Sequence, residues 1–370
     1  MARREGSSLQ QRRLQPAPLL ANDFVAFTRS LLAQDGVLDV YVHSSGEPIT
    51  VEGPAEGPQT LKALPIQTGL RQSLEDGLLA LDGLLAVDVR LVSQPDNADV
   101  RMIRSNGIPF GSESETVLGL SIPHRGSDHP SWDVVINGGA LAGDPAYETY
   151  TALHEIGHVF GEEHVFDGSD GDRSGSRSPW RSLYPDESVM AYRRPRVGMG
   201  WPQSYRRNDL NALASVWKLR PGAQLPLDAG RSSQLVGTGA DDVLIGSVAA
   251  DRLRGLDGDD LLIDGSGADR LEGGPGANVY RSEADRQRDL LVIQLDGKLD
   301  VVRSLGREDR LQLLGADAAD VNVAITASDT SRYGTLPGIG VWVAGRLEVL
   351  VTDPSLQLEQ VQKLTVVLPG

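Results

Sequence analysis

The chain has 370 residues, of which 40% are hydrophobic and 23% charged, as in a soluble globular protein long enough for two domains. Acidic residues outnumber basic ones by 51 to 35, and the formal charge of −16 disfavours nucleic acid and anionic membranes as partners but favours calcium. The chain contains no cysteine, which excludes disulfides, thiolate metal sites and a cysteine nucleophile.

Residues 1–21 are predicted to form a disordered or propeptide-like tail. Arg12 and Arg13 are not followed by a continuous apolar stretch, so the tail lacks the pattern of a cleaved secretory signal. The most apolar stretch of the chain, residues 78–87, contains Asp82 and is far shorter than the about 20 residues that a spanning helix needs. We therefore expect no transmembrane segment.

Residues 22–220 are predicted to form one α+β domain. Apolar residues at helical spacing between Ile66 and Leu81 indicate an amphipathic helix that packs on a sheet. A second helix is expected from about Tyr147, and a third over residues 209–217. Strand-like runs occupy residues 87–92, 100–103 and 132–137.

The second helix carries a zinc-binding pattern. The segment from His154 to His164 reads H-E-I-G-H-V-F-G-E-E-H and fits H-E-x-x-H-x-x-G-x-x-H without a mismatch. His154 and His158, four residues apart, share one helix face, while Gly161 can end the helix and turn the chain so that His164 returns as third ligand. Three protein ligands leave one position for water, as in catalytic zinc sites, and Glu155 is the candidate general base.

The alternative is that these are surface histidines on an ordinary helix. Three of the six histidines of the chain lie in this segment. The residue frequencies give a chance expectation on the order of 10⁻⁵ for the full motif, which favours the zinc site.

The motif resembles that of the metzincin metallopeptidases, which combine this helix with a later methionine-containing turn. The segment Ser188-Val-Met190-Ala-Tyr192 is similar to that turn. The resemblance implies that Met190 lies beneath the zinc ligands. It also implies that Tyr192 is an extra, displaceable ligand whose hydroxyl can stabilise an oxyanion. A core methionine and a core tyrosine are the alternatives for these two residues.

After a linker at residues 221–228, the region 229–370 begins with a nine-residue repeat. Leucines recur every nine residues, followed in phase by Tyr280, and an aspartate or asparagine stands two positions before all but the first. This pattern is similar to the G-G-x-G-x-D-x-U-x nonapeptide of RTX proteins, which form a parallel β-roll around calcium ions. The candidate calcium ligands are Asp242, Asp251, Asp260 and Asp269.

The copies are degenerate, because glycine is missing at positions such as Ala240, Ala249 and Asp264, so we expect only a few calcium ions. If one turn of the roll takes two nonapeptides, Asp242 should stack on Asp260 and Asp251 on Asp269. An acidic glycine-rich linker is the alternative, although linkers do not keep leucine in register.

A metzincin domain followed by such repeats resembles the serralysins, and the resemblance covers residues 87–313. It implies an α+β metzincin domain with a mixed twisted sheet, followed by an all-β parallel β-roll. It also implies a secreted, extracellular zinc metalloendopeptidase that acts on proteins or peptides and leaves the cell through a type I export apparatus. The C-terminal residues 364–370 match the family's apolar tail only in part. We expect a monomer.

In the implied mechanism zinc lowers the pKa of its water, Glu155 takes the proton and later passes it to the leaving amine. The substrate is expected to add as a strand along a sheet edge formed by residues 132–137. One alternative is a catalytically relict, calcium-dependent RTX surface or adhesive protein, although Glu155 and all three histidines are present. Another is a peptidase restricted to a single partner protein or to its own propeptide.

Overall fold

The computed structural model describes residues 12–53, 57–110, 116–126, 129–167, 178, 183–197, 199–225, 232–283, 285–330 and 334–368. Leu14–Lys218 form one compact unit, and a second unit begins at Leu219. This division lies close to the domain end expected at residue 220. Within the described ranges, no helix is both long enough and apolar enough to cross a membrane.

The first unit is built on a mixed five-stranded sheet with the order β4-β1-β5-β7-β6. The pairs β1/β4, β1/β5 and β5/β7 are parallel, whereas β6 runs antiparallel to β7. This unit therefore has the α+β architecture expected from the sequence. The strands are β1 (Val37–Val42), β4 (Asp88–Val92), β5 (Val100–Ser105), β6 (Gly119–His124) and β7 (Ser131–Asn137).

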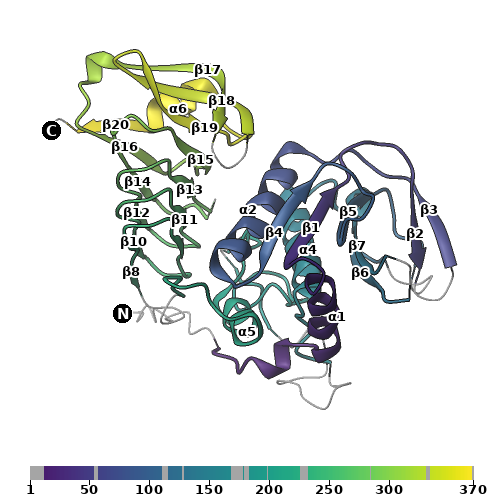
Figure 1. The fold of residues 1–370 in the computed structure, drawn as a ribbon. Helices are drawn as coiled ribbons and strands as arrows, with labels where there is room; N and C mark the ends of the chain where they lie inside the picture. The colour runs from purple at the N-terminus through teal and green to yellow at the C-terminus, as the bar shows by residue number, and fades with distance from the viewer. Residues whose placement is uncertain are drawn as a thin grey trace, which may run out of the picture. The chain divides into compact units, whose positions relative to one another are not determined.

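Helices and a separate hairpin cover the sheet (Figure 1). Trp132 of β7 packs against α1, with its ring 5.4 Å from that of Phe24 and 5.3 Å from that of Phe27. Residues of β7 that point to the other face of the sheet, such as Val135, share a second core with the hairpin β2–β3. The remaining elements are η1 (Ala17–Leu19), α1 (Asn22–Leu32), β2 (Ile49–Gly53), β3 (Gly57–Leu61), α2 (Thr68–Leu84), α3 (Gly138–Leu141), α4 (Pro145–Val159) and α5 (Arg207–Trp217).

The described part of the predicted tail, residues 12–21, is not a free segment. Leu19 and Leu20 are buried, and the Leu19 carbonyl accepts a hydrogen bond of 2.9 Å from the Glu163 amide. The Ala21 amide donates to the Gly161 carbonyl at 2.9 Å. The prediction of a disordered tail is therefore wrong for residues 12–21, because Leu19 and Leu20 are buried and Leu19 is hydrogen-bonded to the segment that follows α4. Residues 1–11 lie outside the described part of the chain.

The sheet edge was placed wrongly in the sequence-based prediction. Residues 132–137 belong to β7, which pairs with β5 on one side and with β6 on the other. The two edge strands are β4 and β6, and β6 (residues 119–124) is a strand that the sequence pattern does not predict.

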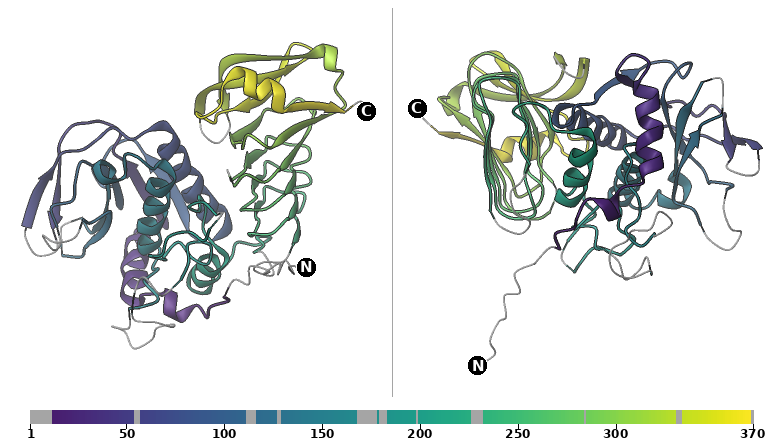
Figure 2. Two further views of the ribbon diagram at one scale, coloured as in Figure 1. Left: turned by 180° about the vertical axis from the view of Figure 1, so that it is seen from behind. Right: turned by 60° about the horizontal axis from the view of Figure 1, so that its bottom comes forward.

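The second unit contains the predicted parallel roll, in which successive short strands alternate between two sheets (Figure 2). Leu235, Leu253 and Leu271 are in register in one sheet, and Leu244 and Leu262 are in register in the other. Each turn takes two nonapeptides, as expected. The strands are β8 (Gln234–Val236), β9 (Val243–Ile245), β10 (Arg252–Arg254), β11 (Leu261–Ile263), β12 (Arg270–Glu272), β13 (Val279–Arg281), β14 (Leu290–Gln294), β15 (Asp300–Ser304) and β16 (Arg310–Leu314).

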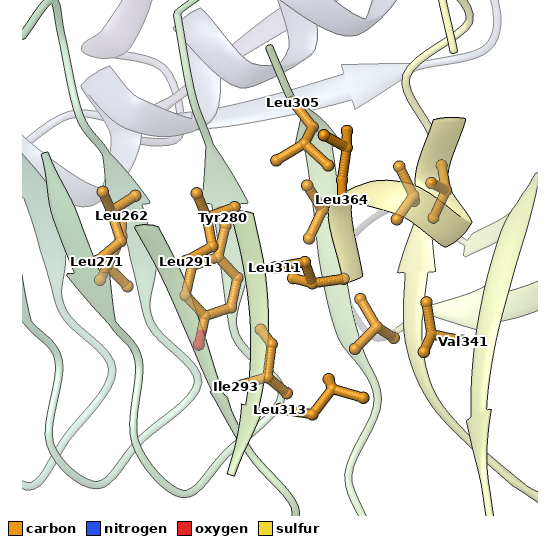
Figure 3. Packing of buried hydrophobic residues seen from close by; sticks show 14 of the residues in the cluster. Leu262, Leu271, Tyr280, Leu291, Ile293, Leu305, Leu311, Leu313, Val341 and Leu364 are labelled. Atoms are coloured by element: carbon orange, nitrogen blue, oxygen red, sulfur yellow. The ribbon is translucent and has the colours of Figure 1, made fainter. Parts of the chain in front are cut away.

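The repeated leucines form the thin core between the two sheets. Leu262 and Leu271 are fully buried, and Tyr280 continues the same row (Figure 3). Farther along, Leu291 and Leu311 extend the row into the C-terminal elements. The core is therefore one residue wide for most of the repeat region and widens only near the end of the chain.

The region beyond β16 departs from the expected all-β parallel roll. There β17, β18 and β19 pair antiparallel, while β20 pairs parallel with β16. Longer strands and a helix became possible here because the nonapeptide pattern has ended. These elements are η3 (Ala318–Asp320), β17 (Val321–Thr330), β18 (Gly334–Val343), β19 (Arg346–Val351), α6 (Leu358–Leu364) and β20 (Thr365–Leu368).

The predicted linker is only partly described. Gln224 forms an isolated parallel bridge with Leu244, so its segment belongs to the roll unit. Residues 226–228 lie outside the described part of the chain, as do residues 369–370 at the predicted export-related end.

Candidate metal centres

The helix that carries the histidines has a defined start and a defined end. Asp144 caps α4 by accepting a hydrogen bond of 3.1 Å from the Tyr147 amide. At the other end Gly161 has φ +102°, its amide donates to the His158 carbonyl at 3.0 Å, and the Glu162 amide donates to the Gly157 carbonyl at 2.8 Å. This pair of bonds is a Schellman motif, which reverses the chain after α4.

Gly161→Ala should destabilise the first unit. The left-handed conformation costs a non-glycine residue about 1–2 kcal/mol, and a Cβ at this position would lie 2.3 Å from Val25 Cγ2. We expect the melting temperature to fall by several degrees in calorimetry, because the turn that leads to His164 is displaced. Gly143→Ala is the matched control, since a Cβ there meets nothing within 4 Å. Equal melting temperatures for the two variants would contradict this account.

The turn brings the three histidines together. Their ligating nitrogens form a group in which all lie within 4.8 Å of one another, and the Nε2 atoms of His154 and His164 are 3.0 Å apart. Two nitrogens bound tetrahedrally to zinc at 2.0–2.1 Å would be about 3.3 Å apart. The three histidines therefore fit a zinc ion.

Main-chain carbonyls orient two of the rings. The Nδ1 atom of His154 lies 2.8 Å from the Val189 carbonyl, and that of His158 lies 2.8 Å from the Glu162 carbonyl. Because a carbonyl can only accept, both Nδ1 atoms carry the proton and both Nε2 atoms offer a lone pair. Burial lowers the pKa of His154 to about 3 and that of His158 to about 4, so both rings are neutral at pH 7 and ready to bind a metal.

Glu155 lies on the same helix and faces β6. Its Oε2 accepts a hydrogen bond of 2.8 Å from the Ser121 hydroxyl, and a Cβ at Gly119 would lie 2.5 Å from its Oε1. Burial raises the pKa of Glu155 to about 8, against the smaller opposing effect of the Ser121 hydrogen bond. The buried carboxyl group thus binds a proton more tightly than an exposed carboxylate does.

Met190 lies against α4, and Tyr192 lies beside two of the histidine rings. Met190 is fully buried, and a Cβ at Gly157 would lie 3.1 Å from its Sδ, so the thioether lies against α4 at Gly157. The Tyr192 ring is 4.9 Å from the His164 ring and 5.7 Å from the His154 ring, and the residue is 38% exposed. Burial raises the pKa of Tyr192 to about 12, so its phenol remains a donor at neutral pH.

Two supporting carboxyl groups were not predicted from the sequence. Asp209 of α5 accepts from the Val189 amide at 3.0 Å and so holds the peptide segment whose carbonyl orients His154. Glu162 is buried, and burial followed by the nearby charge of Asp209 raises its pKa well above the usual range. Neither residue, nor Ser121, stands out in the sequence, because acidic and hydroxyl side chains are ordinarily interpreted as exposed.

The four predicted calcium ligands are all buried and lie in two columns along the roll. The Asp242 amide donates to Asp260 Oδ1 at 2.8 Å, and the Asp251 amide donates to Asp269 Oδ1, with 18 residues separating each pair. The predicted stacking is therefore present, but the two pairs do not converge on one point. A group of three carboxylates within 4.8 Å of one another consists of Asp264, Asp269 and Asp289.

Like charges in this region favour a cation. Burial, with a further contribution from Asp289, raises the pKa of Asp269 to about 8. Burial also raises the pKa of Asp289 to about 7, and Asp309 adds to the shift. Oxygen ligands and repelling carboxylates are the environment that calcium stabilises, so these residues fit that ion.

These shifts give the calcium-free protein a pH dependence. Asp269 and Asp289 bind protons more tightly when folded than when unfolded, so folding stability is lost as pH rises from about 4 through 8. With a chelator present, we expect the melting temperature of the roll to fall between pH 5.5 and pH 8.5. Calcium should flatten the profile. A chelated protein whose calorimetric profile rises over this range would contradict the assignment.

Comparisons with known proteins bear on the repeats. No curated protein matches the chain. A solved structure described as "GM1 bound form of the ECX AB5 holotoxin" shares 15% identity, with 50% of this chain and 72% of that chain covered, and its TM-score of 0.23 supports no structural argument. The family model of the RTX calcium-binding nonapeptide repeat (4 copies) matches residues 233–262 and 245–280. The repeat region of this chain therefore consists of RTX calcium-binding nonapeptides.

Proposed function

We propose that the first unit is a zinc-dependent metalloendopeptidase of the metzincin type, resembling the serralysins. The observation that supports this most directly is the convergence of His154, His158 and His164, two of them with Nδ1 bonded to carbonyls, beside the buried carboxyl group of Glu155. A structural site would need no base next to the metal, and it would fill the fourth position with another protein ligand.

Each residue has a defined role in the proposed reaction. Zinc held by the histidines would supply a bound water with a pKa near about 7 and a Lewis acid for the scissile carbonyl. Glu155 takes the proton from the attacking water and delivers it to the leaving amine, while Ser121 fixes the direction of the carboxyl group. The Tyr192 hydroxyl donates to the oxyanion that develops on the substrate.

The substrate in this proposal is an extended polypeptide that pairs with β6, which lies at one edge of the sheet. Ser121 lies in the middle of that strand and contacts Glu155, so a peptide added there would run past the base. The RTX repeats favour secretion, because calcium is abundant outside cells, and a type I export apparatus is the route proposed from the serralysin resemblance.

The proposal is tested by metal content and cleavage in one preparation. The calcium-loaded full-length protein should contain one zinc per chain by mass spectrometry and should cleave a proteome-derived peptide library at internal bonds. Removing zinc with 1,10-phenanthroline should stop cleavage, and adding zinc back should restore it. A protein that binds zinc but cleaves nothing would favour the relict RTX protein.

Tyr192→Phe should lower kcat by about 10-fold to 100-fold, or roughly 1.4–2.8 kcal/mol, with little change in KM. The hydroxyl is the only group removed, and in this mechanism it matters chiefly once negative charge has formed on the substrate oxygen. Steady-state kinetics on one cleaved library peptide gives both constants. A change confined to KM would assign the hydroxyl to substrate binding instead.

A further inference from the structure

The turns of the roll differ in how their aspartates are satisfied. In the turn that ends at Asp251, the Ser247 amide and hydroxyl both donate to Asp251 Oδ2, at 2.6 and 2.8 Å. Thr238 does the same for Asp242, with its hydroxyl 3.0 Å from Oδ2. In these two turns a side-chain hydroxyl of the turn itself therefore donates a hydrogen bond to the carboxylate.

A third turn is closed by an amide. Asn278 stands where the repeat has aspartate, and its Nδ2 donates to the carbonyls of Gly274 and Gly276 at 2.9 and 3.3 Å. These turn carbonyls are thus bonded to a neutral donor. Each of these carbonyls has one of its two lone pairs engaged and is less available to a cation.

The turn from Asp264 to Asp269 has a different arrangement. Asp264 is fully buried, its Oδ1 accepts from the Glu283 amide at 2.9 Å, and its Oδ2 has no hydrogen-bond partner. The Oδ2 atom of Asp269, which is 3% exposed, also has none. Both residues belong with Asp289 to the group whose ligand oxygens lie within 4.8 Å of one another, and Asp289 differs from them in that its Oδ2 accepts a hydrogen bond of 3.0 Å from the Ser282 hydroxyl.

The carboxylate of Asp264 is a departure from the repeat. Position 264 is a glycine in the nonapeptide, so an ordinary turn contributes only its aspartate and main-chain carbonyls. Buried, unpartnered carboxylate oxygens close to other carboxylates are costly unless a cation is bound. Calcium accepts six to eight oxygen ligands in flexible geometry, and its affinity rises with the number of charged ligands.

We propose that Asp264, Asp269 and Asp289 form a three-carboxylate calcium site, and that this is the tightest calcium site of the roll. The inference does not depend on the peptidase activity, because it concerns residues of the second unit alone. It adds Asp264 and Asp289 to the ligands expected from the sequence. It also ranks the turns, with the hydroxyl-capped turns at Asp242 and Asp251 and the amide-closed turn at Asn278 binding calcium more weakly.

Calcium titration of the full-length protein tests the site. In calorimetry with calcium alone, Asp264→Asn should weaken the tightest class of sites by at least about 10-fold, which corresponds to about 1.4 kcal/mol. Asp264→Gly, which restores the glycine of the repeat, should have the same effect. Asp257→Asn is the matched control, because it removes one exposed charge from the preceding turn and should leave the tightest class unchanged.

A second measurement separates a ligand from a structural residue. In a chelator, Asp264→Asn should melt at the same temperature as the natural protein or higher, because a buried repulsion has been removed. Only the rise in melting temperature caused by calcium should shrink. The proposal is overturned if the tightest class survives in Asp264→Asn, if Asp257→Asn weakens it equally, or if Asp264→Asn is already destabilised in the chelator.

Discussion

Glu155→Gln should reduce peptidase activity by roughly 10²-fold to 10⁴-fold while the protein keeps its zinc. The carboxyl group is buried and hydrogen-bonded to Ser121, and the amide has the same shape, so the fold and the three histidines should be undisturbed. What is lost is the carboxyl group that takes a proton from the attacking water in the proposed mechanism. Single-turnover kinetics and zinc analysis of the same sample measure both parts of the prediction.

Glu155→Ala serves as the comparison that separates chemistry from packing. It removes the base and also leaves a cavity beside Gly119, whereas the glutamine variant removes only the base. Similar activity losses in the two variants would identify proton transfer as the cause. Full activity in the glutamine variant would sink the mechanism, and loss of zinc from it would place Glu155 among the ligands.

Removing calcium should destabilise the roll while leaving the stability of the first unit unchanged. The aspartates of successive turns are buried and close together, and with a formal charge of −16 the chain has a surplus of negative charge. The leucine core is too thin to offset that repulsion, so calcium binding contributes folding free energy. With calcium at about 100 times its Kd, linkage gives a stabilisation of about 2.7 kcal/mol, or about 100-fold in protection.

Amide hydrogen exchange of the full-length protein, followed by mass spectrometry, resolves the two units in one experiment. Peptides from residues 234–314 should exchange about 100-fold faster in a chelator than with calcium. Peptides from α4 and β7 should exchange at the same rate in both conditions and act as the internal control. Roll peptides that exchange at the same rate in both conditions would mean that the leucine core holds the repeats without an ion.

The convergence of the histidines and the register of the roll were predictable because their spacing is set by regular geometry. Four residues on a helix place His154 and His158 on one face, and the nine-residue recurrence of leucine fixes which strands stack. The glycine at 161 was informative for the same reason, since its positive φ is required where the chain reverses. These features depend on neighbours in sequence.

Features that depend on distant contacts were missed or misplaced. The strand β6 has little pattern of its own and forms because β7 offers it an edge, which is why Ser121 was not foreseen beside Glu155. The segment that contains Leu19 was interpreted as tail because the turn after α4, against which it packs, is far away in the sequence.

The hydrogen bonds between stacked turns give the roll a direction. Asp309 Oδ1 accepts from the Asp289 amide, Asp289 Oδ1 from the Asp269 amide, and Asp269 Oδ1 from the Asp251 amide. Each aspartate therefore anchors the turn that precedes it in the chain, as in a one-dimensional array with nearest-neighbour coupling. Order should propagate from the C-terminal end of the stack, and the turn at Ser233, which anchors no other, should be the first to fray.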